Sequence, residues 1–415
     1  MADHQEIERS SSRSTLLYGP VMISDPALGC PLTVAAGRVR TAREGDETSR
    51  FVSGWGATFE EAAQGCLREA DETYFAQVVP EERILRASAD ETVGRLIEPP
   101  TLTLFSEAQY RGRLGWNRHV DDRHRVPNRW TRSRPLGWIK SDGWLGAGEA
   151  WLPAGLCFLG YPHDKEEAGL PVSDSNGLAI GTSLEDAVIR AFGEVVERDA
   201  TAIWWYNRLI LPRIDLPSLA DGLVSRYAEW LRTRDRELRL LHLTLDLPIP
   251  VVAAISNHVR GDAPAVGFAA GASWSQAARR AVGELAQCEA NLALLDERAR
   301  RFGISDFTVG ALHLYRWHCE ANIRHLPHLS GGPVTSVLPN ISKLDCNTCV
   351  EMCRERKLEL FVVILRQHDE WPLVRVFVPG LRPTKPRFAS GRLYDVPTRL
   401  ELMHACHLYE APFPV

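Results

Sequence analysis

The 415-residue sequence predicts a mixed α/β (α+β) protein with one large domain. Apolar runs rich in β-forming residues recur along the chain, and long patterns of helical period lie between them. No Pro/Gly/Ser-rich linker is long enough to separate two domains, and strands and helices do not alternate strictly. The apolar runs are Val21–Ile23, Leu32–Val34, Leu240–Leu245, Ile249–Ile255, Leu358–Leu365 and Leu373–Val378. The helical patterns cover residues 58–76, 183–206, 273–301 and 345–357.

Composition and charge exclude several classes of protein. Apolar residues make up 45% of the chain and the formal charge is -5, which argues against a generic nucleic-acid or anionic-membrane binder. No apolar run approaches the ~20 residues of a membrane-spanning helix. Residues 1–14 are polar and predict a disordered N-terminus, followed by one catalytic domain over residues 15–415. Nine thinly spread cysteines are typical of reduced thiols, so we expect a cytoplasmic protein.

A basic segment interrupts this balance between residues 117 and 140. It holds seven Arg or Lys residues against Asp121 and Asp122. A solvated insertion loop and a docking surface for an acidic peptide or partner protein both explain such a segment.

The strongest pattern is an internal repeat that carries acids. Each copy has Gly, then Ser or Thr two residues later, then Glu, Asp or Gln three residues on, directly followed by Ala. Seven residues after that Ala comes a Glu, which we call the first acid of the copy. Three residues after the first acid comes a second Glu or a Gln. The copies are Gly56/Thr58/Glu61/Ala62/Glu69/Glu72, Gly181/Ser183/Asp186/Ala187/Glu194/Glu197 and Gly271/Ser273/Gln276/Ala277/Glu284/Gln287.

Each element of the repeat has a physical reason. Gly allows a tight turn, and Ser or Thr with an acid or amide three residues later resembles a helix capping box. Ala in the first turn permits close helix packing. At about 100° per residue, Ala and the first Glu lie on nearly one line, and the last polar residue is adjacent on that face. Each copy therefore predicts a capped helix that presents two polar side chains on one face.

Five carboxylates from three helices repel one another unless cations hold them. The set is Glu69, Glu72, Glu194, Glu197 and Glu284, with the amide of Gln287 in the sixth position. Mg²⁺ prefers hard oxygen ligands and usually binds through a few carboxylates together with substrate phosphates. The repeat therefore predicts a magnesium-nucleotide site. The chain contains neither a GxxxxGK[ST] motif nor a complete GxGxxG motif, so this site is neither a P-loop nor a dinucleotide fingerprint.

The second copy, within Ser175–Ala200, closely resembles the signature of the YcaO family, whose members bind ATP through acids on helices outside any P-loop. The first copy resembles that family's first acidic helix, and the third copy resembles its ExxQ helix. Residues Val374–Leu381 are similar to the family's late strand and Pro-Gly turn. The resemblance covers roughly residues 30–400 and implies a YcaO-type fold.

The chain also departs from the family pattern. Gly65 replaces a small hydroxyl residue that often precedes the first acid, and Arg190 holds the equivalent place in the second copy. Trp55 stands where a lysine often occurs, and the proline-rich tail is reduced to Pro412 and Pro414. These changes are compatible with magnesium ligation by the acids. The reduced proline content argues against an active-site role of the C-terminal tail.

The resemblance implies ATP-dependent activation of peptide backbone amides, with ATP and Mg²⁺ as cofactors. Ser175, Asn176 and Gln287 would join the acids in binding the nucleotide, and Arg198 would orient Glu194 or a phosphate. Glu194, Glu197 and Arg198 are the expected catalytic group. The product would be a thiazoline or oxazoline ring formed from Cys, Ser or Thr of a ribosomal precursor peptide.

The resemblance also implies partners. These would be a ubiquitin-activating-enzyme-like leader-binding protein and an FMN-dependent dehydrogenase, in a hetero-oligomer or around a homodimer. Two alternatives stay open: thioamide formation with a TfuA-type partner, and a non-catalytic scaffold that assists another modifying enzyme.

Two smaller features have the residue types of functional sites. Cys346, Cys349 and Cys353 have the spacing of a partial metal motif but also of an apolar helix stripe, and packing is the favoured interpretation. The pair Trp204-Trp205 is expected in the core rather than in a base-stacking platform.

Overall fold

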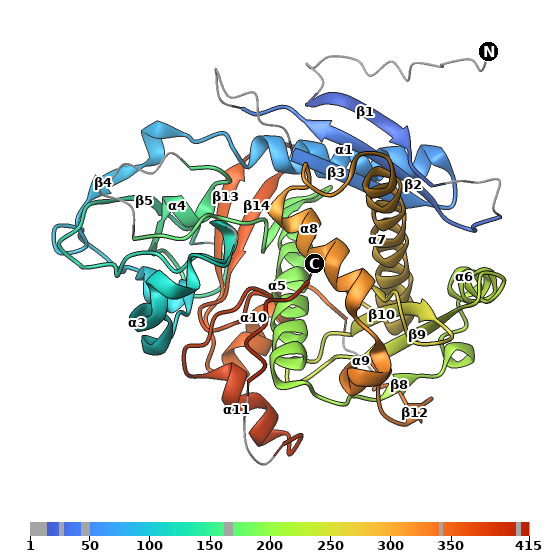
Figure 1. Cartoon of the computed structure of the whole chain (residues 1–415). Coiled ribbons are helices and arrows are strands. Elements are labelled where there is room, and N and C mark those ends of the chain that lie inside the picture. Colours follow the sequence, from blue (N-terminus) through green and yellow to red (C-terminus); the bar gives the residue numbers. More distant parts are fainter. Residues whose placement is uncertain are drawn as a thin grey trace.

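A computed structural model describes residues 15–24, 29–42, 50–120, 122–143, 145–161, 169–339, 343–403 and 408–414. Within this part, helices surround four small sheets, so the mixed α/β class is confirmed (Figure 1). The expected disorder of residues 1–14 lies outside the described residues. In the described chain, no helix is long and apolar enough to cross a membrane.

The first sheet is antiparallel and has the order β1-β2-β3. Its strands are β1 (Leu16–Met22), β2 (Thr33–Val39) and β3 (Arg50–Gly56). Helix α1 (Phe59–Phe75) follows directly and buries Ala62, Ala63, Cys66 and Ala70 against this sheet. Small side chains on this face let helix and sheet approach closely.

The second sheet has the order β11-β10-β9-β8-β12. Its strands are β8 (Arg213–Ile214), β9 (Arg236–His242), β10 (Val251–His258), β11 (Ala265–Ala270) and β12 (Val334–Thr335). Every residue of β11 is buried, as expected for a strand covered on both faces. Helices α6 (Gly222–Arg232) and α7 (Trp274–Phe302) pack against this sheet.

Two three-stranded sheets complete the framework. One has the order β13-β14-β7, with strands β13 (Phe361–Arg366), β14 (Leu373–Phe377) and β7 (Leu178–Ile180). The other has the order β4-β5-β6, with strands β4 (Leu85–Ala87), β5 (Leu136–Lys140) and β6 (Trp151–Pro153). Helix α5 (Leu184–Asn207) runs through the centre of the molecule between the β13–β14 strands and α7 (Figure 1).

Shorter helices close the periphery. They are α2 (Pro99–Thr103), α3 (Glu107–Trp116), α4 (Ala154–Cys157), α8 (Val309–Glu320), α9 (Pro327–Ser330), α10 (Cys346–Glu355) and α11 (Arg392–Arg399). The Trp204 and Trp205 rings are buried, so their expected place in the core is confirmed.

The cysteines of α10 face the core that surrounds α5. Cys349 and Cys353 are buried there, and Cys346 packs at the edge of the same cluster. Burial raises the pKa of the Cys353 thiol to about 12, so this thiol stays protonated at neutral pH. The contacts of these cysteines with the core support the packing interpretation.

The basic segment 117–140 is largely paired with local acids. Arg129 bonds Glu107 at 2.7 Å, and Lys140 Nζ lies 2.5 Å from Glu149 Oε2. Arg132 contacts Asp90 and Glu98. These exposed pairs support the interpretation as a solvated surface; Asp121 lies outside the described residues.

The three repeat copies form one recurring unit, in which a strand at a sheet edge leads directly into a long helix. The units are β3-α1, β7-α5 and β11-α7. Each helix has the expected N-cap: the side chains of Thr58, Ser183 and Ser273 accept from the backbone N–H three residues later. The side chain at that third position bonds the amide before the cap, rather than the cap itself as in a capping box.

The repeat glycines are required by close approach and not by a positive φ. A Cβ atom on Gly181 would lie 2.2 Å from the backbone nitrogen of Ala187, the alanine of the same copy. On Gly271 it would lie 2.6 Å from Ala277 N. Each strand therefore ends directly against the first turn of its helix, and this fixes the direction in which the helix leaves the sheet.

We predict that Gly181→Ala destabilises the fold by about 1–3 kcal/mol, because backbone atoms cannot yield to the added methyl group. Gly112→Ala in α3 is the matched control: no atom lies within 4 Å of the added Cβ. It should be neutral or stabilise by up to about 1 kcal/mol. Urea unfolding of both variants measures the effect, and equal stability of the two would contradict the close-contact role.

Candidate functional site

One cavity of about 700 Å³ collects the polar residues of all three repeat copies. It lies between α1, α5 and α7, the helices that follow the three edge strands. The residues that the repeat predicts to converge all line it: Glu69, Glu72, Glu194, Glu197, Glu284 and Gln287. Ser175 and Arg198 line the same cavity. The spacing in the sequence therefore corresponds to one place in the molecule.

The first acid of each copy is held by the backbone of its own unit, within the edge strand or directly before it. Glu69 Oε2 accepts from Ser53 N at 3.0 Å, and Glu194 Oε2 accepts from Gly177 N at 3.2 Å. Glu284 interacts with the backbone N–H of Phe268 in β11. Each of these carboxylates is thereby oriented by a backbone N–H group.

The last polar residue of each copy reaches the strand of the next unit. Glu72 of α1 accepts from Ile180 N in β7 at 3.1 Å, and Glu197 of α5 accepts from Ala270 N in β11 at 3.0 Å. Gln287 of α7 closes the cycle by donating from Nε2 to Ser53 Oγ in β3 at 2.8 Å. We call these three contacts the inter-unit ring. Ser53 N is already bonded to Glu69, so the third contact uses the Ser53 hydroxyl instead. The side-chain amide of Gln287 can donate to this hydroxyl oxygen, whereas an ionised carboxylate can only accept.

Burial raises the pKa of every carboxyl in the cavity. Desolvation is the largest cause, and it raises the pKa of Glu69, Glu194 and Glu197 to about 7 and that of Glu72 to about 8. Burial also raises the pKa of Glu284. Repulsion from Glu194 adds to the shift of Glu72. Glu69 remains accessible to cavity water, whereas Glu197 is only 3% exposed.

Arginines are interleaved with the acids. Arg198 lies 3.3 Å from Glu194 Oε1 and 3.7 Å from Glu197 Oε1, so it contacts both acids of α5. Arg190 pairs with Asp186 on α5. The sequence interpretation missed the cationic part of the wall, which comprises Arg50, Arg68, Arg190 and Arg280.

A signal for two of these arginines was present in the repeat. Arg190 and Arg280 stand four residues before the first acid of their copies, in the place that Gly65 holds in the first copy. Residues four apart share a helix face, and all three line the cavity. The departures Gly65 and Arg190 are therefore variations of one cavity-lining position.

The donor set fits Mg²⁺ together with an anionic ligand. Carboxylate oxygens are the ligands that Mg²⁺ prefers, and the arginines provide positive charge for phosphates. Glu197 Oε1 is buried without a hydrogen bond, which leaves one oxygen available for ligation. Within the described residues, however, no three acids, histidines or cysteines stand close enough to form a complete metal cluster. The phosphates of a nucleotide would supply the missing ligands.

Asn176 has a different place from the one expected. Its neighbour Ser175 lines the acid cavity, but Asn176 lines a second, smaller pocket on the other side of the same loop. Asp174 shapes this loop by accepting from Asn176 N at 3.1 Å. The loop thus forms a wall between two pockets, and adjacent side chains face opposite sides.

Comparison with known proteins shows the family and the fold. A sequence model of the YcaO family, described as an ATP- and Mg²⁺-binding cyclodehydratase, matches residues 53–382, which confirms the two expected cofactors. A heterocyclase structure in complex with substrate and cofactor is 28% identical, with a TM-score of 0.82 over 95% of this chain and 54% of that chain. The heterocyclase TruD is 30% identical, with a TM-score of 0.72 over 85% of this chain and 50% of that chain.

A more distant structure supports the fold alone. The YcaO protein of Methanopyrus kandleri, bound with AMPPCP and Mg²⁺, is 22% identical, with a TM-score of 0.58 over 85% of this chain and 83% of that chain. The present chain spans about half the length of the two heterocyclase chains.

The raised carboxyl pKa values predict a pH-dependent stability. Between their ordinary pKa of 4.5 and about 7 to 8, the folded protein binds more protons than the unfolded chain. Without Mg²⁺ and ATP, the free energy of unfolding should therefore fall as pH rises through this window.

Glu72→Gln should flatten this slope by up to about one proton, because it removes the carboxyl with the highest of these pKa values. Glu61→Gln, outside this cavity, is the control. Urea unfolding at a series of pH values measures the slope. A slope unchanged in Glu72→Gln would contradict the assigned protonation.

Proposed function

The chain belongs to the YcaO family, and from this premise we propose that it is an ATP-dependent peptide cyclodehydratase. It would convert Cys, Ser or Thr residues of a ribosomal precursor peptide into thiazoline or oxazoline rings. The observation that carries the proposal is the single cavity in which carboxylates from three helices meet arginines. Such a cavity suits a dication and a polyphosphate together.

We assign Mg²⁺ ligation to the five carboxylates of the cavity. They are Glu69, Glu72, Glu194, Glu197 and Glu284. Glu197 Oε1 has no hydrogen bond and would be open to a cation, whereas Glu194 Oε1 would have to share a cation with Arg198. Ligation requires the carboxylates to lose their protons, and the positive charge of Mg²⁺ would lower the pKa values that burial has raised.

The arginines and the loop before α5 would position the nucleotide. Arg198 holds Glu194 at 3.3 Å and stands beside Glu197, so its charge lies where phosphate oxygens would meet the acids. Arg280 donates to Ala270 O at 2.9 Å, which anchors this second cation at the β11 side of the cavity. Ser175 lies on the cavity wall within reach of a bound ligand, and Gln287 is held in place by Ser53.

The proposed reaction requires the oxygen of a peptide amide to become a good leaving group. A side-chain thiol or hydroxyl of the peptide adds to the preceding amide carbon, and the amide oxygen must then leave. ATP supplies the phosphoryl group that makes this oxygen a good leaving group, giving ADP and phosphate. Fixed charges around the phosphates contribute most of the catalysis in such transfers, and the cavity is built from them.

Partners are part of the proposal. The chain spans about half the length of the two heterocyclases, and we include separate partner proteins in the proposal. They would be a ubiquitin-activating-enzyme-like leader-binding protein and an FMN-dependent dehydrogenase, the latter oxidising the rings. The similarity at 28% and 30% identity to heterocyclases supports ring formation over thioamide formation. The intact carboxylate set supports a catalytic role over a non-catalytic scaffold, because contacts between units alone need no charge, as the amide of Gln287 shows at the third position.

The effect on turnover of replacing acids in the cavity can be compared with the effect of replacing an acid outside it. Glu194→Gln and Glu197→Gln should each lower ATP-dependent loss of water from a Cys-, Ser- or Thr-containing precursor by at least about 10²-fold. The reason is that each removes a charge from a site that would hold a dication. The assay contains the partner proteins, and unfolding curves of each variant are recorded in parallel.

Glu61→Gln is the matched control on α1. Its side chain accepts from Ala57 N at 2.7 Å at the helix start, and Gln276 makes the equivalent bond to Ala272 N in the third copy. The Gln variant should therefore keep this bond, cost less than about 1 kcal/mol of stability and lose little turnover per folded molecule. Full turnover of the Glu194 and Glu197 variants, with loss in Glu61→Gln, would show that the repeat is architectural.

A further inference from the structure

The second pocket, which Asn176 lines, has a volume of about 90 Å³ and lies beside the acid cavity. Its walls are the loop 173–176, strand β14 and the turn-rich segment 379–387 that follows it. A water molecule in the liquid occupies about 30 Å³, so the pocket has room for one small polyatomic group.

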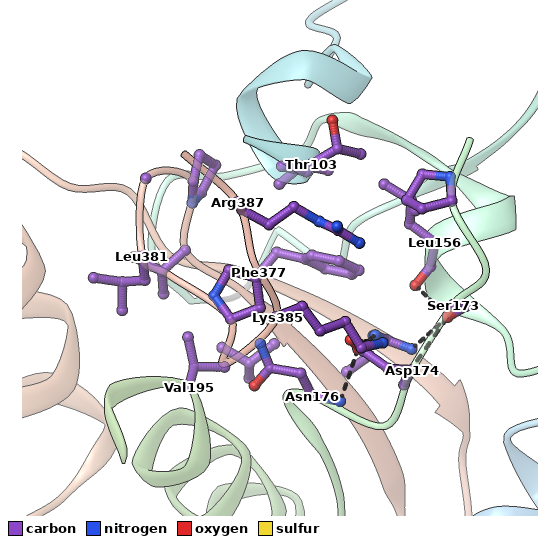
Figure 2. A pocket seen from close by; sticks show the side chains of 18 of the residues that line it. Thr103, Leu156, Ser173, Asp174, Asn176, Val195, Phe377, Leu381, Lys385 and Arg387 are labelled. Carbon is purple, nitrogen blue, oxygen red and sulfur yellow. Dashed lines mark hydrogen bonds and ion pairs between the residues drawn. The ribbon is translucent and has the colours of Figure 1, made fainter. Parts of the chain in front are cut away.

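Three cationic side chains and one acid face this pocket. Arg375 Nη2 lies 3.3 Å from Asp174 Oδ1, and Lys385 Nζ lies 2.7 Å from Asp174 Oδ2. Figure 2 shows Lys385 and Arg387 extending from the same side, with their charged ends directed toward Ser173 and Asp174. Among the described residues, no carboxylate forms an ion pair with Arg387, so the lining carries two positive charges in excess.

Several polar groups of the lining lack full hydrogen-bond partners. Arg375 is 3% exposed, and its Nε has no partner in the described structure. Asn176 Oδ1 is likewise buried without one, and rotation of this amide would present its NH₂ group instead. Arg387 is 4% exposed; its bonds to Pro386 O and Arg123 O are both long, at 3.4 Å.

Excess buried charge is unfavourable unless an anion offsets it. Burial lowers the pKa of Lys385, and it lowers that of Arg387 to about 10. The Phe105 ring, 3.9 Å from Arg387 Cζ, offsets only part of this cost. Water alone satisfies donors but supplies no negative charge.

We propose that this pocket is a subsite for a single oxyanion group, a carboxylate or a phosphate. Arg375 Nε and Arg387 would donate to its oxygens, and Lys385 would supply charge while it remains paired with Asp174. Two sources offer this chemistry: inorganic phosphate released in the acid cavity, and an acidic side chain of the bound peptide.

The subsite is coupled to the acid cavity through one loop. Asn176 faces the subsite, whereas Ser175 faces the cavity and Gly177 N holds Glu194 at 3.2 Å. On α5, Val195 lines the subsite directly after Glu194 of the cavity. An occupied subsite would therefore fix the segment that positions Glu194.

Isothermal titration of the full chain with inorganic phosphate and, separately, with sodium acetate tests the proposal. EDTA is present and nucleotide is absent, so the result does not depend on the proposed activity. Saturable binding of at least one anion is expected, with a Kd below about 10 mM. Lys385→Gln should weaken it at least tenfold, because the pocket loses a positive charge and Asp174 loses the cation that neutralises it, and Lys385→Arg should restore it.

Arg280→Gln distinguishes this subsite from the acid cavity, whose wall contains Arg280. Anion binding should survive in this variant. Tighter binding of phosphate would identify the released product as the source, and tighter binding of acetate would identify a peptide carboxylate. Binding of neither anion, or loss in Arg280→Gln with retention in Lys385→Gln, would overturn the proposal. Circular dichroism confirms that each variant is folded.

Discussion

The inter-unit ring is the interaction on which the rest of the molecule depends. Glu72 bonds the strand before α5, Glu197 bonds the strand before α7, and Gln287 bonds the strand before α1. Three sheets that share no strand are thereby joined around one cavity by the side chains that line it. Binding chemistry and architecture consequently use the same residues, and the cavity cannot change shape without loosening the contacts between units.

This arrangement has an energetic consequence. Burial disfavours charged carboxylates, which raises their pKa values toward neutrality in the protein alone. The backbone donors and Arg198 offset part of the cost, and a bound dication would offset more. The cavity is therefore arranged for a ligand with positive charge at the acids and negative charge at Arg190, Arg198 and Arg280. A magnesium-bound polyphosphate has both.

Much of this was predictable from spacing, and the rest required the fold. The acid helices begin and end within a residue or two of their expected bounds, because Thr58, Ser183 and Ser273 are unambiguous caps. Their convergence followed from the threefold repeat. The ring did not, since the partner strand of Glu72 is 108 residues away. The oxyanion subsite was equally hidden: Asp174 and Arg375 are 201 residues apart and neither belongs to the repeat.

The most direct test of the three-helix site is a crystal structure with Mn²⁺ in place of Mg²⁺ and a non-hydrolysable ATP analogue. Anomalous scattering then locates the metal independently of any assumption about the ligand. The peaks should lie at direct ligand distance from carboxylates of at least two of the helices α1, α5 and α7, between them and the phosphates. Metal and nucleotide bound elsewhere, with the cavity carboxylates still bonded only to the protein, would contradict the central claim.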